Sequence, residues 1–282
     1  MKTGVIDVGG GFRGIYGAGV FDSCLDQDIS FDYCIGVSAG SANMASFLGG
    51  QKERNIKFYI DYGFRKQYAS LGNLLRKKSY LDLDYIYGTL SNTGGEYPLN
   101  YDSIMASPTE FVIVTCNALT GETIYLNKSQ LSRDHYDVFK ASSALPVVCR
   151  PYVFGGVPCF DGGIADPVPV ARAFADGCDR VVLILTRPRD EMRTQDKDRL
   201  PARHLARTYP RAAEQLLLRY KKYNDSLELA KRYEAEGRLL IVAPDDCCGL
   251  STISRSHESL EQMYQKGYRD AAAIRPFLEK AE

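Results

Sequence analysis

Short apolar runs alternate with longer segments of helical periodicity along most of the chain. Short, mostly apolar runs predict buried strands, and apolar side chains that recur every three or four residues predict helices packed on a sheet. The predicted strands are 4–8, 33–37, 110–116, 121–126, 152–156, 157–160, 180–186 and 238–244, and the predicted helices are 15–25, 39–48, 136–144, 211–236 and 256–280. Because strands and helices alternate, we expect an α/β fold with a central, mostly parallel sheet flanked by helices in three α/β/α layers.

The segment 51–109 does not follow this alternation. It is rich in tyrosine and contains a turn signal at Asn92-Thr93-Gly94-Gly95. It is typical of helices and loops that cover a sheet edge, and the alternative is a lid or the wall of a substrate site.

The composition changes near residue 187. Residues 187–222 hold eleven Lys and Arg against five Asp and Glu, in a chain whose 35 basic and 35 acidic residues otherwise balance. The segment is either a solvated helix face or a patch that contacts anionic lipid headgroups at a membrane surface. We expect one domain over 1–185 and a C-terminal helical extension with one strand over 186–282, packed on that domain.

The bulk composition narrows the classes of function. The zero net charge gives no support for nucleic acid as a partner. No apolar run approaches the length of a membrane span, and the N-terminus lacks the pattern of a secretion signal. The eight cysteines include no C-x-x-C pair, and the three histidines are far apart, so we expect reduced thiols and no metal site. These features favour a cytoplasmic protein, with peripheral contact to a membrane as an option.

A glycine-rich loop follows the strand at 4–8. Gly9-Gly10-Gly11-Phe12-Arg13-Gly14 precedes the predicted helix at 15–25, with Asp28 and Asp32 about twenty residues on. The spacing fits a dinucleotide-binding loop. It equally fits an oxyanion hole, because successive backbone amides beside a helix N-terminus stabilise a developing negative charge. A plain tight turn is the third interpretation.

A second motif follows the strand at 33–37. Gly36-Val37-Ser38-Ala39-Gly40 is a G-x-S-x-G sequence between a strand and a helix, which is typical of a nucleophile elbow with Ser38 at its apex. A serine nucleophile needs a base, yet His135, His204 and His257 each lie in a polar context typical of the surface. The base must therefore come from another residue type.

Four blocks together resemble the patatin-like phospholipase family. They are the glycine loop 9–14, the elbow 36–40, Ala141-Ser142-Ser143-Ala144-Leu145-Pro146 and Asp161-Gly162-Gly163, in family order over roughly residues 1–185. The resemblance implies a serine–aspartate dyad, with Ser38 as nucleophile and Asp161 as general base. It also implies that the loop from Gly9 to Gly14 forms the oxyanion hole, with the amides of Gly10, Gly11 and Phe12 as donors.

Three details qualify this resemblance. Asp166 is a second carboxylate near the Asp161-Gly162-Gly163 motif, and Asp161 is preferred because it occupies the motif position. Many members of the family carry an acid directly before the glycine block, whereas here that position is Val8 and Asp7 lies one residue earlier. Arg13 is expected to fix the loop or to favour an anionic substrate, and Ser142 and Ser143 to shape the site.

The expected function is a serine esterase acting on acyl esters, of phospholipids or related lipids, through an acyl-enzyme and without metal or cofactor. Two alternatives remain. One is a dinucleotide-binding oxidoreductase that uses the loop Gly9–Gly14, and the other is a non-catalytic lipid-binding protein that retains the motifs.

Overall fold

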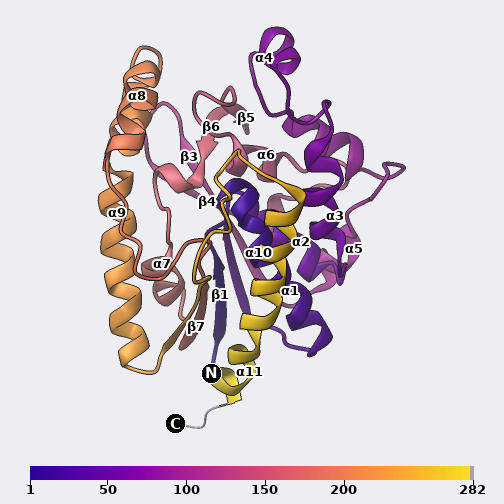
Figure 1. Ribbon diagram of the computed structural model, residues 1–282, viewed down its shortest axis with the longest axis vertical. Helices are drawn as coiled ribbons and strands as arrows, with labels where there is room; N and C mark the ends of the chain where they lie inside the picture. The colour runs from indigo at the N-terminus through magenta and orange to yellow at the C-terminus, as the bar shows by residue number, and fades with distance from the viewer. Residues whose placement is uncertain (280–282) are drawn as a thin grey trace.

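The computed structural model describes residues 1–279, and Figure 1 shows their arrangement. The strands are β1 (Thr3–Asp7), β2 (Tyr33–Val37), β3 (Glu110–Asn117), β4 (Thr123–Asn127), β5 (Tyr152–Phe154), β6 (Val157–Asp161), β7 (Arg180–Ile184) and β8 (Leu239–Val242). The α-helices are α1 (Ile15–Asp26), α2 (Ala39–Leu48), α3 (Arg54–Ile60), α4 (Leu71–Lys77), α5 (Tyr101–Ala106), α6 (Asp137–Ser143), α7 (Val170–Ala175), α8 (Asp196–Leu205), α9 (Pro210–Ala235), α10 (His257–Asp270) and α11 (Ile274–Glu279). Short helical turns of other types are η1 (Gly11–Gly14), η2 (Tyr62–Phe64), η3 (Tyr85–Leu90), η4 (Lys128–Gln130), η5 (Gly162–Ile164) and η6 (Ala271–Ala273).

One sheet of eight strands forms the centre of the molecule. Its order is β5-β6-β3-β2-β1-β7-β8, with β4 paired to β3 outside this path. Strands β3, β2, β1, β7 and β8 run parallel, whereas β4 and β6 pair antiparallel with β3, and β5 pairs antiparallel with β6. The prediction of a mostly parallel sheet is confirmed, and the antiparallel strands gather at one end of it.

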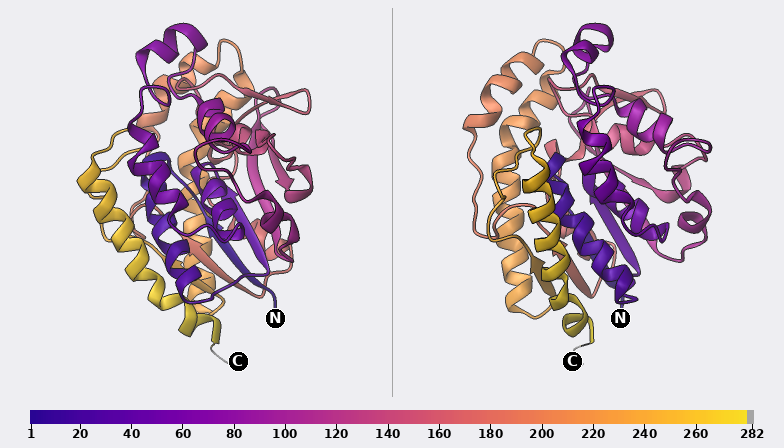
Figure 2. Two further views of the ribbon diagram at one scale, coloured as in Figure 1. Left: turned by 90° about the vertical axis from the view of Figure 1, so that its right-hand side faces the viewer. Right: turned by 45° about the vertical axis from the view of Figure 1, so that its right-hand side comes forward.

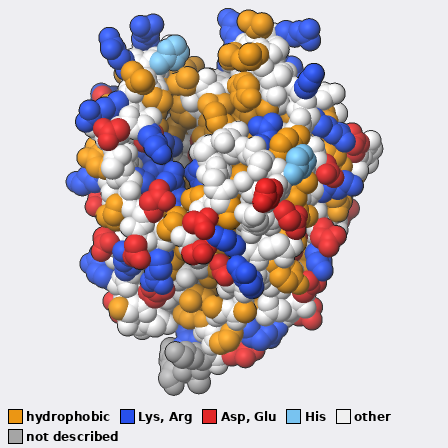
Figure 3. Space-filling model, viewed as in Figure 1, with side chains coloured by type: hydrophobic (Ala, Val, Ile, Leu, Met, Phe, Trp, Pro, Cys, Tyr) orange, Lys and Arg blue, Asp and Glu red, His pale blue; other side chains and the backbone are white. Residues whose placement is uncertain are grey.

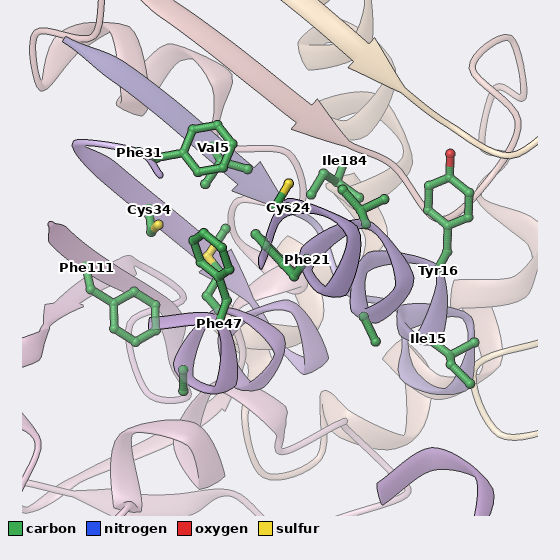
Figure 4. Close-up of a cluster of buried hydrophobic side chains, with 14 of the residues drawn as sticks. Val5, Ile15, Tyr16, Phe21, Cys24, Phe31, Cys34, Phe47, Phe111 and Ile184 are labelled. Atoms are coloured by element: carbon green, nitrogen blue, oxygen red, sulfur yellow. The ribbon is translucent and has the colours of Figure 1, made fainter. Parts of the chain in front are cut away.

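Helices cover both faces of this sheet, as Figures 1 and 2 show. Successive side chains of a strand point to opposite faces, so on β1 Val5 joins one buried cluster and Ile6 the other. The first cluster contains residues of α1, α2 and α10, and the second contains residues of α7 and α9. Figure 4 shows part of the first cluster, including Phe21, Phe47 and Phe111. The three predicted layers are therefore present.

The C-terminal part of the chain completes this core. Strand β8 extends the sheet by pairing with β7, and α10 lies along α1. The two helices approach backbone to backbone: a Cβ at Gly19 would lie 2.1 Å from the carbonyl oxygen of Tyr264, and one at Gly267 would lie 2.0 Å from that of Tyr16. The C-terminal residues thus share one sheet and one core with the rest of the described chain. The domain boundary at residue 185 stays a prediction.

The prediction of one closing helix over 256–280 is wrong within the described residues. Helix α10 ends at Asp270, the chain passes through η6, and α11 begins at Ile274. Pro276 supplies the physical reason, because its ring has no N–H to donate to the carbonyl four residues earlier and collides with that carbonyl in a continuous helix.

Candidate active site

Ser38 and Asp161 come together through the register of two strands on β3. β2 ends at Val37, opposite Val114, and β6 ends at Asp161, opposite Thr115, the next residue of β3. β4 pairs with the other edge of β3 over the same residues, so β2 and β6 share one edge. The residue that follows β2 therefore lies beside the last residue of β6.

The local backbone presents Ser38 at a sharp turn between β2 and α2. Ser38 has φ 56° and ψ −128°, a conformation that non-glycine residues rarely adopt. Neither flanking glycine has space for a side chain: a Cβ at Gly36 would lie 2.5 Å from Cα of Ser41, and one at Gly40 would lie 2.3 Å from the carbonyl oxygen of Asp7. This is the strand–turn–helix geometry that a nucleophile elbow requires.

Neighbouring hydroxyls hold the backbone of the elbow. The amide of Ser38 donates to Oγ of Ser142 at 2.9 Å, and that hydroxyl donates to the carbonyl of Val114 at 2.7 Å. The hydroxyl of Ser41 donates to the carbonyl of Ser38 at 2.6 Å. Ser142 thus supports the backbone of the turn at Ser38.

Asp161 is buried, with 4% of its surface exposed. Its Oδ1 accepts the amide of Gly163 at 2.8 Å, while Oδ2 is enclosed without a partner in hydrogen-bond geometry among the described residues. Burial raises the pKa of the Asp161 carboxyl, and the Ser38 hydroxyl, the Gly163 amide, Arg219 and Arg193 oppose that rise. The Ser38 hydroxyl therefore lies close enough to favour the ionised carboxylate, although no hydrogen bond of good geometry joins the two side chains among the described residues.

Asp166 occupies a different environment. The hydroxyl of Tyr125 donates to its Oδ2 at 2.7 Å, and it does not line the cavities that contain Ser38. The geometry thus favours Asp161 over Asp166 as the base. At the neighbouring glycines, a Cβ on Gly162 would lie 2.3 Å from the carbonyl oxygen of Val114, so this turn also needs glycine.

The glycine loop lies against the elbow. Gly9, Gly10 and Gly11 have φ of 61°, 121° and 62°, all in the region that favours glycine. A Cβ at Gly9 would lie 2.3 Å from the carbonyl oxygen of Val37, which shows how closely the loop and β2 approach. Among the described residues, the amides of Gly10 and Gly11 have no hydrogen-bond acceptor. These two amides are free to serve as oxyanion donors.

The amide of Phe12 was expected to be a third oxyanion donor, but it already has a hydrogen-bond partner. It donates to the carbonyl oxygen of Thr252 at 3.2 Å. Thr252 belongs to the segment between β8 and α10, and no sequence pattern predicts that this segment reaches the loop. The Phe12 amide is consequently occupied in this structure.

Asp7 is a residue whose role the motifs did not reveal. Its carboxylate is fully buried and accepts the amide of Gly9 at 2.8 Å and the side-chain amide of Asn43 at 2.9 Å. Burial raises the pKa of Asp7 to about 6, although both hydrogen bonds favour the charged form. The sequence signal that could have revealed this role is an acid at the end of an otherwise apolar strand. The acid that contacts the glycine loop is therefore Asp7, one residue before Val8.

Two cavities meet at Ser38. The first spans about 740 Å³, including the part open to solvent, and is mainly apolar, with Phe12, Phe58, Tyr59, Leu83, Ile86 and Tyr87 in its wall. The second spans about 590 Å³ on the same basis and is lined by Asp161 together with Arg13, Arg187, Arg193 and Arg219. Gly11, Ser38 and Leu145 line both. Figure 3 shows the surface hollowed between α4 and α8, with basic side chains along the side of α8 and apolar ones toward α4.

The tyrosine-rich segment supplies much of the apolar wall. Tyr59, Tyr68 and Tyr87 all line the first cavity, so part of 51–109 forms the wall of the site. Gly14 lies behind this wall, since a Cβ there would be 2.5 Å from the hydroxyl of Tyr59. None of the three histidines lines either cavity, and His257 stacks on Phe64 with ring centroids 3.9 Å apart.

Comparison with known proteins gives consistent matches. A family model described as patatin-like phospholipase matches residues 8–174, and a model described as a domain of unknown function (DUF6363) matches residues 209–280. The uncharacterized protein YjjU of Escherichia coli K12 is 30% identical over 192 residues, which cover 66% of this chain and 52% of YjjU. Lysophospholipase NTE1 of Debaryomyces hansenii is 29% identical over 191 residues, which cover 65% of this chain and 12% of NTE1. This chain therefore matches only about half of YjjU and a small part of NTE1.

One solved structure aligns over nearly the whole chain. VipD from Legionella pneumophila matches 97% of this chain and 66% of its own, with a TM-score of 0.49 and 14% identity. Residues 8–174, where the first family model matches, contain both Ser38 and Asp161.

Proposed function

The chain belongs to the patatin-like phospholipase family, and from this premise we propose that it is a serine acyl hydrolase that cleaves acyl esters of lipids. The observation that supports the proposal is that β2 ends at Val37 opposite Val114 and β6 ends at Asp161 opposite Thr115, so that Ser38, the residue after β2, lies near Asp161 where the two cavities meet. Ser38 is the nucleophile and Asp161 the general base.

The reaction proceeds in two steps. Oγ of Ser38 attacks the ester carbonyl while Asp161 takes its proton, and the amides of Gly10 and Gly11 stabilise the oxyanion that forms. Collapse of this intermediate breaks the ester bond, and Asp161 returns the proton to the departing alcohol. In the second step Asp161 takes a proton from a water molecule as its oxygen attacks the acyl-enzyme, and it returns this proton to Oγ of Ser38 as the acyl bond breaks and the fatty acid leaves. The N-terminus of α2, which begins directly after Ser38, favours negative charge at the serine oxygen.

The apolar cavity is proposed as the acyl-chain site. Its wall of aromatic and aliphatic side chains removes the chain from water, which contributes about 0.8 kcal/mol per methylene. A single apolar cavity beside the nucleophile suits an ester with one acyl chain. The name of the related NTE1 proteins, lysophospholipases, agrees with this choice of substrate class.

Contact with a membrane surface is the second part of the proposal. Leu71, Leu75 and Leu200 are 71%, 84% and 76% exposed, on α4 and α8. Both helices lie at the same end of the molecule, on either side of the hollow (Figures 1 and 3). No helix within residues 1–279 is long and apolar enough to cross a bilayer. Exposed leucines beside the basic segment 187–222 suit adsorption to an anionic lipid surface.

The test of the hydrolase proposal compares Ser38→Ala and Asp161→Asn with the wild type on a chromogenic acyl ester. Each variant should lose at least about a thousandfold in kcat/KM, with an unchanged thermal unfolding midpoint. Asp166→Asn is the matched control, since it removes a nearby carboxylate outside the cavities and should retain activity. Near-wild-type turnover by either dyad variant would refute the assignment.

A further inference from the structure

The second cavity at Ser38 is strongly cationic. Four arginines line it, namely Arg13, Arg187, Arg193 and Arg219, whereas Asp161 is the one acidic side chain among its described lining residues. Three of the four lie beyond residues 8–174, where the patatin-like model matches. They come from the segment after β7 and from α9, so the C-terminal part of the chain builds this wall.

Two of these arginines have carboxylate partners, and Arg193 does not. Arg219 donates from Nε to Asp198 at 3.0 Å, and Arg187 pairs with Glu191; neither acid lines the cavity. Within residues 1–279 the guanidinium of Arg193 forms no ion pair, and it lies 5.4 Å from the ring centre of Tyr223. Arg193 therefore lacks a direct ion pair, and Asp161 and Asp198 act on its charge only from a greater distance.

The backbone of Arg193 is held firmly in place. Its amide donates to Oδ1 of Asn224 at 2.8 Å, and its carbonyl accepts from Nδ2 of Asn224 at 3.0 Å. This pair of hydrogen bonds joins the segment to α9. The guanidinium is thus presented from a fixed point of the backbone.

Two buried polar groups of the cavity lack partners. The hydroxyl of Tyr223, a residue 3% exposed, forms no hydrogen bond within the described chain, and neither does Nε of Arg13, a residue 6% exposed. Buried polar atoms are nearly always hydrogen-bonded in native proteins. Two unpartnered donors in the lining of one cationic cavity indicate that a ligand supplies the acceptors.

The charges of the wall also repel one another. Burial and the neighbouring Arg219 and Arg187 lower the pKa of Arg193 to about 9, and burial and Arg187 lower the pKa of Arg13 to about 10. Both side chains remain charged at neutral pH. An anion beside Arg187, the neighbour that lowers both pKa values, would relieve this repulsion and replace lost hydration.

We propose that this cavity is a subsite for the phosphate group of the substrate, held by Arg187, Arg193, Arg219 and Tyr223. Planar guanidinium groups bind phosphate oxygens through paired hydrogen bonds, and several of them suit a multiply charged group. The inference rests on the proposed function: with the acyl chain in the apolar cavity and the ester at Ser38, a phosphate on the alcohol side enters the cationic cavity. The preferred substrate is then a lysophospholipid with an accessible phosphate.

The experiment compares two esters with the same acyl chain, 1-palmitoylglycerol 3-phosphate and 1-palmitoylglycerol, in the same detergent micelles. Arg193→Gln should lower kcat/KM for the phosphate ester at least about tenfold more than for the neutral ester. The quantity compared is the ratio of kcat/KM for the phosphate ester to kcat/KM for the neutral ester. This ratio is needed because Arg193 also favours the charged form of Asp161, and that effect acts on both esters alike. Arg232→Gln changes an exposed arginine of α9 that does not line the cavity; it is the control and should leave the ratio unchanged. A ratio within about twofold of wild type in Arg193→Gln overturns the proposal.

Calorimetry separates the phosphate site from the hydrolase proposal. The Ser38→Ala protein is titrated with 1-palmitoylglycerol 3-phosphate, with glycerol 3-phosphate and with inorganic phosphate, with and without Arg193→Gln. Binding of the two glycerol phosphates that requires Arg193 supports the subsite even if the wild type hydrolyses neither ester. Inorganic phosphate binding as tightly as the lysolipid overturns the assignment to a lipid headgroup, and absence of binding by all three overturns the site. If Arg193→Gln unfolds, Tyr223→Phe replaces it and should weaken binding in the same direction.

Discussion

The carbonyl oxygen of Thr252 accepts the amide of Phe12 at 3.2 Å, so the segment between β8 and α10 rests directly on the glycine loop. The hydroxyl of Thr252 also accepts from the guanidinium of Arg13 at 3.3 Å. A part of the chain that lies outside the patatin-like match therefore holds the loop that is proposed to bind the oxyanion. We therefore expect a change in either the glycine loop or the segment between β8 and α10 to disturb the other.

Gly11→Ala should abolish activity and destabilise the fold. A Cβ at Gly11 would lie 2.1 Å from the carbonyl oxygen of Thr252, and φ is 62°. The glycine loop or the segment that contains Thr252 must then move, which should lower the free energy of unfolding by about 1 to 3 kcal/mol. Ester hydrolysis and urea unfolding measure the two effects.

Gly50→Ala is the matched control for this substitution. Gly50 has nearly the same φ, 65°, but nothing lies within 4 Å of a Cβ there. It should cost about 1 kcal/mol and keep full activity. Equal activity losses in both variants would contradict the role given to the contact with Thr252.

The pH profile of hydrolysis should reflect the environment of Asp161. Burial raises the pKa of this carboxyl above the ordinary 3.8, and only the ionised form accepts a proton from Ser38. We therefore expect kcat/KM on a neutral ester to fall, as pH is lowered, through a midpoint above 3.8. Arg193→Gln should move this midpoint upward, since it removes a charge that favours the carboxylate, and a downward movement would be inconsistent with the assignment.

Ala42→Phe should change the acyl-chain preference. Ala42 is on α2 and lines the apolar cavity beside Ser38. A phenyl group there takes space that a long chain would fill, so each excluded methylene should cost about 0.8 kcal/mol of binding. Activity on a long-chain ester should fall far more than on a butyryl ester of the same alcohol. A uniform loss on both would point to damage at the elbow instead.

The stability of the fold should depend on Asp22 in a defined direction. Asp22 on α1 accepts from the hydroxyl of Tyr264 on α10 at 2.8 Å, and burial raises its pKa to about 6. The folded protein then binds this proton more tightly than the unfolded chain. The wild type should therefore lose stability relative to Asp22→Asn as pH rises from about 4 to about 6, by roughly 3 kcal/mol in all.

Urea unfolding of both proteins at several pH values in this range measures the difference. Carboxylates that the two proteins share change both unfolding free energies equally, so their effect cancels in the difference. One of them is Asp246, whose pKa is lowered by Lys266 and whose titration therefore changes stability in the opposite direction. A difference that stays constant with pH would contradict the raised pKa of Asp22.

The turn between strand and helix at Ser38 could be predicted from local features alone. Its motif, the strand before it and the helix after it lie in one short stretch, and the tight turn needs glycine at fixed positions. Asp161 could not be found that way, because it reaches Ser38 through the pairing of β6 on the edge of β3 where β2 ends. Its assignment depended on the family resemblance.

The arginine-lined cavity at Ser38 could not be predicted from the sequence, for a related reason. The helical periodicity of 211–236 predicts a buried stripe of six residues: Leu216, Leu217, Tyr220, Tyr223, Leu227 and Ala230. Four of them are buried, whereas Leu217 and Tyr220 are half-buried. Periodicity identifies the inward face of a helix, but not what that face meets. That Tyr223 borders a cavity, and that Arg193 from a preceding segment joins it, depends on how α9 packs against the sheet.

The most direct test of the central claim is the site of covalent modification by a fluorophosphonate, read by intact-mass and peptide mass spectrometry. We expect a single adduct on Ser38 in the wild type, none in Ser38→Ala, and much slower labelling in Asp161→Asn because the serine has lost its base. A folded wild-type protein that remains unlabelled, or that is labelled at another residue, would contradict it.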